Sequence, residues 1–232
     1  MKLHEDIEIF GLGLFFEDTL ILSDIHLGIE ESLNKEGMFI PRYHYEDIVK
    51  ETVELIEELR PERIIINGDL KHDLSSINKA EWKQIPKYLE ILSKHAELII
   101  IKGNHDIHLT SMLKNTDYKL VDSYVIKNKF VLHGHEIIDT DCDTIIIGHN
   151  HPAVTLSHDN RDEKFKCFLK GKYKDKTLIV MPSFSNLTEG TDILKDKQLS
   201  PYLTDLSEFE VFVAEADGMY FGKVKDLEKM MK

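Results

Sequence analysis

A run of apolar, mostly β-branched residues followed at once by polar residues occurs five times within the first 151 residues of this chain. In order, the polar segments are residues 23–26, 67–69, 102–106, 133–135 and 148–151. Continuous apolar runs of this length are typical of strands buried on both faces of a sheet. The pattern therefore predicts buried strands that each end in a segment rich in Asp, Asn or His.

Amphipathic patterns between the runs predict helices. Residues 43–59 carry apolar residues among acids and stop before Pro61, and residues 81–92 show the same pattern. Pro86 is expected to kink or divide the second helix. Strands that alternate with helices indicate an α/β fold, in which ligands bind at the carboxyl ends of the strands.

The second half of the chain changes character, with strand-like stretches and few helical patterns. The predicted strands are residues 164–170, 176–180, 210–214 and 219–224. We expect them to pair antiparallel and to form a second sheet packed on the first. Residues 7–22, near the start of the chain, are also predicted to form short strands. Because the chain has no repeat or Gly/Ser/Pro-rich linker, we predict a single domain over residues 1–232.

Composition limits the function classes. A formal net charge of -13 argues against a protein whose whole surface binds nucleic acid, although bound metal ions can attract phosphate locally. Cys142 and Cys167 lie far apart in sequence, so we expect two buried thiols and no disulfide or zinc-thiolate site. No apolar run approaches the ~20 residues that span a bilayer, and the start lacks a signal-peptide layout. A cytoplasmic protein without membrane contact is expected.

The polar segments offer carboxylate, imidazole and amide groups, which borderline divalent metals accept together. In an extended Asp-x-His segment both side chains leave on one face, so Asp24 and His26 are expected to reach one ion. The same argument pairs the histidines of the two later His-x-His segments, His133 with His135 and His149 with His151.

Asp69 stands alone in its segment and is the natural bridge between two ions. Hydrolysis of phosphate esters by two metals needs a shared carboxylate between ions ~3.5–4 Å apart, which positions a hydroxide for in-line attack. Each motif alone is more often an ordinary turn or a structural histidine. All five in order, each after a buried strand, favour a two-metal phosphoesterase.

Five segments carry a family resemblance: SDIHLG (23–28), NGDL (67–70), GNHD (103–106), LHGH (132–135) and GHNHP (148–152). They resemble the calcineurin-like metallophosphoesterase superfamily. Within it the chain most resembles archaeal SbcD-related phosphoesterases and bacterial DNA-ligase-associated metallophosphoesterases, with added support from residues 28–31, 37–42 and 181–185. The resemblance implies an α/β fold of the four-layer α/β/β/α sandwich type, with two mixed sheets flanked by helices.

The resemblance also implies roles for individual residues. One metal would be held by Asp24, His26, Asp69 and His151, and the other by Asp69, Asn104, His133 and His149. His105 would stabilise the phosphoryl oxygens and protonate the leaving group. His72 resembles the histidine that SbcD-type nucleases use near the substrate, with a solvated loop histidine as the alternative. The implied cofactors are two divalent metal ions, Mn²⁺ in the first place and Ni²⁺, Fe²⁺ or Zn²⁺ as alternatives.

Other polar residues have more than one interpretation. Asp73 and Asp106 are either carboxylates that orient a histidine or ordinary turn acids. His135 either touches substrate or supports the fold, and we favour support. Residues 42–44 follow Pro41 in a loop that could border the cleft, but a solvated cluster is the expectation.

The favoured function is a phosphodiesterase or nuclease acting on nucleic acid. The absence of a basic stripe and the short chain favour single-stranded or short substrates, and the resemblance suggests a DNA-repair partner. The alternative is a small-molecule phosphodiesterase or phosphomonoesterase, for example on cyclic nucleotides. The GDLKHD and GNHD segments disfavour a phosphoprotein phosphatase, which usually carries GDxxDRG and GNHE. The intact ligand set and His105 disfavour a binding module without activity.

Overall fold

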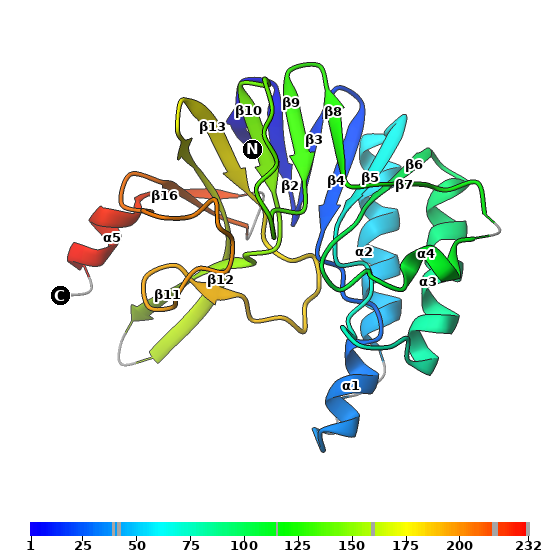
Figure 1. The fold of residues 1–232 in the computed structure, drawn as a ribbon. Coiled ribbons are helices and arrows are strands. Elements are labelled where there is room, and N and C mark those ends of the chain that lie inside the picture. Colours follow the sequence, from blue (N-terminus) through cyan, green and yellow to red (C-terminus); the bar gives the residue numbers. More distant parts are fainter. Residues whose placement is uncertain (39, 41–42, 115, 159–160, 215–217, 231–232) are drawn as a thin grey trace.

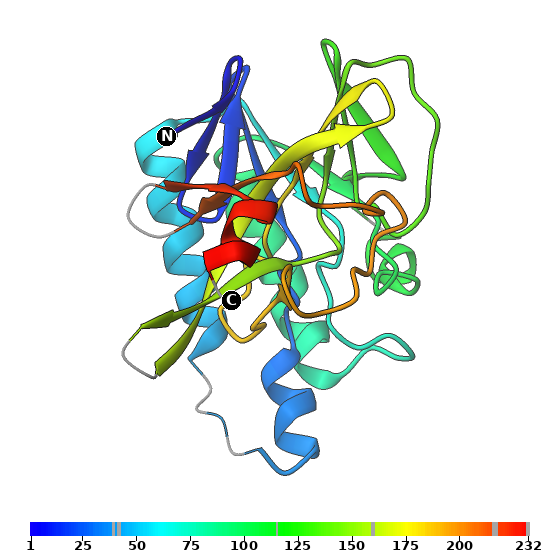
Figure 2. The same ribbon diagram turned by 90° about the vertical axis from the view of Figure 1, so that its left-hand side faces the viewer.

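The computed structural model describes residues 1–38, 40, 43–114, 116–158, 161–214 and 218–230. Two β-sheets pack face to face, and the larger helices lie on the outer side of the first sheet (Figure 1, and Figure 2 at right angles). Phe39, Pro41 and Arg42, which belong to one of the segments that support the narrower resemblance, lie outside the described residues.

The first sheet has the strand order β1-β2-β3-β4-β5-β6-β7 in the described chain. Its strands are β1 (Lys2–His4), β2 (Ile7–Phe10), β3 (Gly13–Phe16), β4 (Thr19–Ser23), β5 (Arg63–Asn67), β6 (Glu97–Ile101) and β7 (Lys119–Val121). Strands β1 to β4 pair antiparallel, and β4 to β7 pair parallel. The opening strands therefore extend the first sheet.

The second sheet is mixed and has the main order β14-β11-β12-β13-β10-β9-β8. Its strands are β8 (Ser123–Ile126), β9 (Lys129–Leu132), β10 (Thr144–Ile147), β11 (Pro152–His158), β12 (Arg161–Tyr173), β13 (Lys176–Val180), β14 (Thr191–Asp192), β15 (Glu210–Val213) and β16 (Met219–Lys223). The predicted antiparallel pairing is confirmed for β12 with β13 and β15, and for β15 with β16. In addition, β13 pairs parallel with β10, and β10 with β9. The five apolar runs are thus divided between two sheets, three in the first and two in the second.

The helices in the described chain are α1 (Ile29–Lys35), α2 (His44–Leu59), α3 (Lys79–Ser93), α4 (Leu109–Met112) and α5 (Val224–Met230). Both predicted helices are confirmed. In α2 the residues Ile48, Thr52 and Ile56 recur every four positions and are buried, as an amphipathic helix requires. Helix α3 begins with a capping box between Asn78 and Glu81 and continues through Pro86, so the proline does not divide it.

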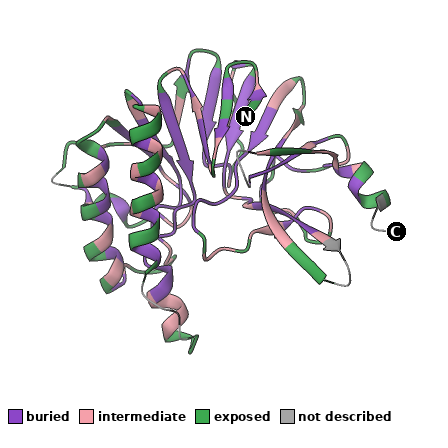
Figure 3. Cartoon of the chain, turned by 180° about the vertical axis from the view of Figure 1, so that it is seen from behind, coloured by how far each residue is buried: buried purple, intermediate pink, exposed green. Residues whose placement is uncertain are grey.

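Three apolar clusters hold the layers together. One lies between the first sheet and helices α2 and α3, the second lies between the two sheets, and the third lies on the outer face of the second sheet. The outer layer of the second sheet combines α5 with irregular chain, through residues such as Tyr202, Leu206 and Leu227. Figure 3 shows the strands as mostly buried. The four-layer α/β/β/α architecture is confirmed, with a fourth layer that is only partly helical.

Both cysteines, Cys142 and Cys167, are buried free thiols, as expected. None of the helices in the described ranges is both long enough and apolar enough to cross a membrane.

Candidate metal centre

The five polar segments meet at one edge of the molecule although they come from two sheets. In the first sheet β4, β5 and β6 end at Ser23, Asn67 and Ile101, and in the second sheet β9 and β10 end at Leu132 and Ile147. Strands β4 to β6 run parallel to one another, as do β9 and β10 (Figure 1). Parallel strands place their carboxyl ends at the same edge of a sheet, and the packing of the two sheets brings the two edges together.

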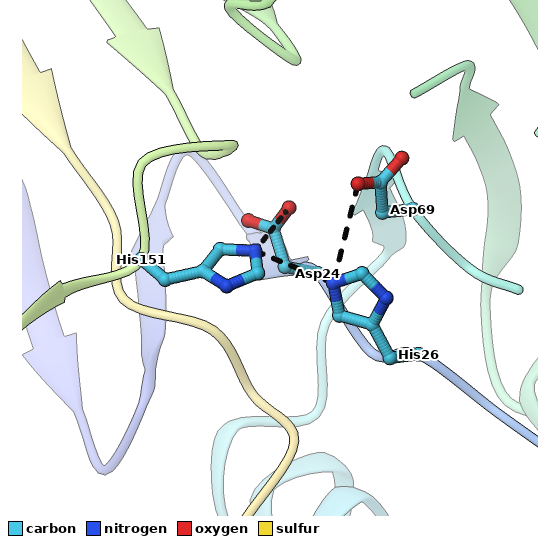
Figure 4. Close-up of side chains that lie close together, drawn as sticks. All are labelled: Asp24, His26, Asp69 and His151. Atoms are coloured by element: carbon cyan, nitrogen blue, oxygen red, sulfur yellow. Dashed lines mark hydrogen bonds and ion pairs between the residues drawn. The ribbon is translucent and has the colours of Figure 1, made fainter. Parts of the chain in front are cut away.

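The first group of candidate ligands is drawn in Figure 4 and comprises Asp24, His26, Asp69 and His151. One ligand atom from each lies within 4.8 Å of the others. His151 Nε2 is 3.1 Å from Asp24 Oδ1 and 3.3 Å from His26 Nε2. His26 Nε2 is 4.0 Å from Asp69 Oδ2. Two carboxylates and two imidazoles therefore converge on one point.

The second group shares Asp69 with the first and adds His133 and His149. His133 Nε2 is 3.4 Å from Asp69 Oδ2, and the rings of His133 and His149 have centroids 4.9 Å apart. Asn104 joins them, because its Oδ1 is 3.1 Å from His133 Nε2. The structure thus brings all seven predicted ligands together, with Asp69 between the two groups.

The backbone at the first ligand segment differs from the prediction. Asp24 and His26 have φ angles of 55° and 51°, so the segment is not extended. Both side chains still reach one group, because two left-handed residues turn the chain sharply after β4. Left-handed residues other than glycine cost roughly 1–3 kcal/mol each and cluster at functional sites.

The predicted pairing of the later histidines is wrong. His149 and His151 have φ angles of 61° and 46°, and they belong to different candidate groups. His135 belongs to neither group, although its ring centroid is 5.3 Å from that of His133. The argument from an extended backbone fails here because left-handed residues break the alternation of side chains.

Glycines allow the strand ends to approach this closely. A Cβ atom at Gly103 would overlap Asp69 Oδ1, and one at Gly148 would overlap Asp24 Oδ2. The Gly-Asn-His and Gly-His segments of the sequence therefore carry glycine because a carboxylate occupies the space of a side chain.

Hydrogen bonds orient the carboxylate of Asp24. It accepts from Ser23 Oγ at 2.6 Å and from the backbone N–H of His149 at 3.0 Å, while Ser183 Oγ donates to the Asp24 carbonyl at 2.6 Å. We did not predict these serine roles from the sequence. The sequence carries only a weak signal for them, because Ser23 directly precedes Asp24 and Ser183 lies within residues 181–185, which support the narrower resemblance.

Within the described residues, the two candidate orienting acids accept hydrogen bonds from backbone N–H and hydroxyl groups, and neither forms one with a histidine. Asp106 is buried and accepts hydrogen bonds from the backbone N–H groups of Gly103 and Lys71, at 3.0 and 3.2 Å. It therefore ties the loop after β6 to the loop after β5. Asp73 caps an exposed turn formed by residues 75–76. The prediction that either acid orients a histidine is not supported, and Asp73 behaves as a turn residue.

Electrostatics within the site favour anionic carboxylates. Burial by itself would raise the pKa of Asp24 and of Asp69, but attraction to the neighbouring histidines outweighs it and lowers both. Burial lowers the pKa of His149 to about 4, with repulsion from His133 as a second cause. Burial also opposes a charge on His133, but the two carboxylates outweigh it and raise its pKa to about 9.

This donor set fits two divalent cations. Asp24 and Asp69 are 0% and 2% exposed, and within the described residues every ion-pair partner of either carboxylate is a histidine. Buried carboxylates need positive charge nearby, and without metal a protonated His133 supplies it. Divalent cations can supply that charge instead, with neutral imidazoles as ligands. The clustered Asp and His side chains therefore fit a binuclear divalent metal site.

The two predicted catalytic histidines lie beside these groups. The backbone N–H of His105 donates to Asp69 Oδ1 at 2.9 Å, and its Nε2 is 3.8 Å from Asp69 Oδ2. His105 Nδ1 contacts the carbonyl oxygen of His72. The ring centroid of His72 is 5.4 Å from that of His26. Both histidines therefore face the candidate ligands.

The expectation of a solvated cluster at residues 42–44 is wrong for His44 and right for Tyr43, and Arg42 lies outside the described residues. His44 is buried, and its Nε2 is 2.9 Å from Ser185 Oγ. Tyr43 is 70% exposed. His44 helps to fix the start of α2 and does not line the candidate site.

Several known proteins are similar to this chain in sequence or in fold. Over 96 residues the chain is 34% identical to the DNA polymerase II small subunit of Methanocaldococcus jannaschii, a match that covers 37% of this chain and only 16% of that relative. The nuclease MPE of Pseudomonas putida has a similar fold, with a TM-score of 0.66 at 20% identity over 90% of this chain and 92% of that one. The phosphoesterase YfcE of E. coli aligns with a TM-score of 0.47 at 15% identity, over 88% and 97% of the chains.

The family match covers most of the chain. Residues 18–207 match the model of the calcineurin-like phosphoesterases, and that range contains every candidate ligand from Asp24 to His151. The chain therefore belongs to the calcineurin-like phosphoesterase family.

Proposed function

We propose that this chain is a two-metal phosphodiesterase that acts on nucleic acid. The observation that carries the proposal is the pair of candidate ligand groups that share Asp69, with His105 next to the shared carboxylate. Membership of the phosphoesterase family indicates hydrolysis of phosphate esters as the reaction class. Hydrolysis by two metals requires a carboxylate shared between them.

In this proposal the two ions share Asp69, and their other ligands are separate. Asp24, His26, Asp69 and His151 hold one ion, and Asp69, Asn104, His133 and His149 hold the other. Two bound ions would supply Lewis-acid charge to the phosphoryl oxygens and lower the pKa of water. The mixture of oxygen and nitrogen donors suits Mn²⁺, with Ni²⁺, Fe²⁺ and Zn²⁺ as alternatives.

His105 is proposed as the proton donor. A carbonyl oxygen only accepts, so the contact with His72 places a hydrogen on His105 Nδ1 and leaves Nε2 facing the candidate metal ligands. When Nε2 also carries a proton, the imidazolium of His105 can bind a phosphoryl oxygen and deliver that proton to the leaving oxygen, which leaves the neutral ring with its Nδ1–H on the His72 carbonyl. His72 fixes the ring of His105 through its carbonyl, and its own imidazole lies close enough to contact the substrate.

The choice of nucleic acid is supported by the nuclease of similar fold and by the DNA polymerase subunit matched over part of its length. The net charge of -13 favours a second candidate, a small-molecule phosphodiesterase or phosphomonoesterase, because long duplexes need basic surface. Single-stranded or short substrates reconcile both observations.

The first test compares a diester with a monoester. Metal-stripped protein receives Mn²⁺, Ni²⁺, Zn²⁺ or Mg²⁺ separately and is assayed with bis-p-nitrophenyl phosphate and p-nitrophenyl phosphate. Faster turnover of the diester with Mn²⁺ is expected. A preference for the monoester would favour the second candidate, and no turnover with any metal would contradict both.

Labelled oligonucleotides then separate nucleic acid from small molecules. We expect Mn²⁺-dependent cleavage of single strands in preference to duplexes. Turnover of small diesters without cleavage of any oligonucleotide would contradict the nucleic-acid part of the proposal.

A further inference from the structure

A cavity of ≈ 400 Å³ opens beside the second ligand group. It lies among the loop after β6, helix α4 and the loop after β9. Asn104 and His133 form part of its wall, so the cavity is continuous with the candidate metal centre. Pockets for small ligands fall in a range of roughly 300–1,000 Å³, and this volume is enough for one small organic group next to a bound phosphate.

Part of the cavity wall is apolar. Ile107, Leu132 and Ile138 line it, and Ile107 is 69% exposed. An isoleucine so exposed beside a polar site gains nothing in the free protein, but it can cover one face of a planar ring. Thr110 and His135 line the same cavity and offer a hydroxyl and an imidazole for hydrogen bonds.

The charged residues of the cavity disfavour a phosphate there. Lys102 Nζ is paired with Asp122 Oδ1 at 2.9 Å, and Glu136 adds a further carboxylate. Lys102 is the only Lys or Arg among the described residues that line the cavity, and Asp122 already neutralises it, so Glu136 leaves the wall away from the metal centre negative. A phosphate group is attracted to the metal side of the cavity, whereas the rest of the cavity accepts an uncharged group.

We propose that this cavity binds the single nucleoside at the end of a strand, or of a nucleotide ester, while the adjacent phosphodiester lies at the metal centre. The inference rests on the proposed function and adds the substrate class to it. An apolar face with hydrogen-bonding edges matches a nucleoside, and the carboxylate of Glu136 disfavours a further phosphate on that nucleoside. Chain ends are therefore preferred to chain interiors.

The test compares three p-nitrophenyl diesters with the Mn²⁺-loaded protein: the methyl ester, the thymidine 5′-ester and the thymidine 3′-ester. A filled cavity should lower KM for one thymidine ester by about 10-fold relative to the methyl ester, which corresponds to about 1.4 kcal/mol. Equal KM values for all three would overturn the inference and leave the proposed function intact. Failure to hydrolyse even the methyl ester would contradict the proposed function itself.

A matched pair of variants locates the effect. Thr110→Trp fills the cavity, whereas Ser111→Trp places the same ring on the next, exposed residue, which does not line it. We expect Thr110→Trp to abolish the preference for the thymidine ester over the methyl ester and Ser111→Trp to retain it. Ile138→Ala removes apolar wall without adding bulk and should weaken the preference. If the preference survived in both Thr110→Trp and Ile138→Ala, the nucleoside would bind elsewhere.

The charge argument has its own test. A second phosphate on the free hydroxyl of the better thymidine ester should raise KM, and Glu136→Gln should remove much of that penalty while the Lys102–Asp122 pair stays intact. If the added phosphate lowered KM, the cavity would accept a continuing strand and the preference for chain ends would be wrong.

Discussion

Asp69 is the residue on which both candidate ligand groups depend. It is 2% exposed, its backbone has a φ of 45°, and one oxygen accepts a hydrogen bond from the backbone of His105. That hydrogen bond leaves Oδ2 directed at His26, His105 and His133, with contacts of 4.0, 3.8 and 3.4 Å. A residue placed in this way can bridge two ions.

Asp69→Ala should therefore lose bound metal as well as activity. Removal of a partner outside the ligand shell typically costs roughly 10–100-fold in affinity or activity, and loss of the bridging ligand should exceed that. Elemental analysis and diester turnover of the same sample check this prediction. Two ions per chain retained in Asp69→Ala would contradict the bridging role.

His105→Ala should behave differently, because His105 contacts the bridge and is not among the candidate ligands. We expect both metals to stay bound while the rate falls by about 10²–10⁴-fold, with larger losses for poor leaving groups. His95→Ala, at the opposite end of β6, is the control and should match the wild type. Loss of metal from His105→Ala would make it a ligand and overturn its assignment as proton donor.

At the scale of elements, the site depends on how closely strand ends approach. Gly148 follows β10 and lies against Ser23, the last residue of β4 in the other sheet, and against Asp24, which comes next. Its φ is not in the left-handed region, so its role is to leave space. Gly11 is the opposite case, with a φ of 53° and no atom within 4 Å of an added Cβ.

The two glycines make a matched experiment. Gly148→Ala should displace Asp24 and reduce metal affinity by at least about 10-fold, a cost comparable to loss of an orienting partner. Gly11→Ala should cost roughly 1–2 kcal/mol of stability and leave metal binding unchanged. Calorimetric titration with Mn²⁺ together with thermal melts separates the two effects. Equal metal affinities in both variants would mean that the sheets can separate without cost.

The start of α2 depends on a buried histidine. His44 Nε2 contacts Ser185 Oγ at 2.9 Å. The ammonium group of Lys166 lies close by and donates hydrogen bonds to the carbonyl oxygens of Ser183 and Ser185. Burial, followed by repulsion from Lys166, lowers the pKa of His44 from 6.5 to about 4, and attraction to Asp47 only partly offsets it. The folded state therefore favours neutral His44.

The sign of the pH effect follows from that shift. Below pH 6.5 the unfolded chain binds a proton that the folded chain resists, so His44 makes the free energy of unfolding fall as pH drops from 6.5 to about 4. The loss is at most about 3 kcal/mol. His44→Gln should flatten the curve of stability against pH in this window, as measured by urea unfolding at several pH values. Parallel curves for the two proteins would show that His44 titrates normally.

At the scale of the whole molecule, the cluster between the sheets contains residues from both. Ile21 and Ile65 of the first sheet pack with Ile146, Phe168 and Ile179 of the second. Loss of one sheet would expose this cluster on the other, so the two sheets are expected to unfold together.

The prediction of a single domain over residues 1–232 is tested by cooperativity. Fluorescence of Trp82, in α3, and far-ultraviolet circular dichroism should give one coincident thermal transition in metal-free protein. Mn²⁺ should move both probes to the same higher midpoint, because an ion that binds only the folded state stabilises it. Two separate transitions would contradict a single domain.

The sequence by itself determined which residues could form the site. Five apolar runs predicted the buried strands, because a strand buried on both faces needs continuous apolar residues. The Asp, Asn or His that follows each run predicted where the strand ends. Helical periodicity located α2 and α3, because a helix that packs on a sheet needs apolar residues along one face. These features are local, and so they can be read from neighbouring residues alone.

The tertiary structure decided how those segments combine. Left-handed residues separate His149 from His151, and packing of two sheets brings the ends of β4 and β10 together. The roles of Ser183 and Asp106, and the cavity beside Asn104, likewise arise from contacts between segments distant in sequence. The spacing of apolar residues along the sequence does not predict such contacts, because their energies depend on which surfaces face each other after folding.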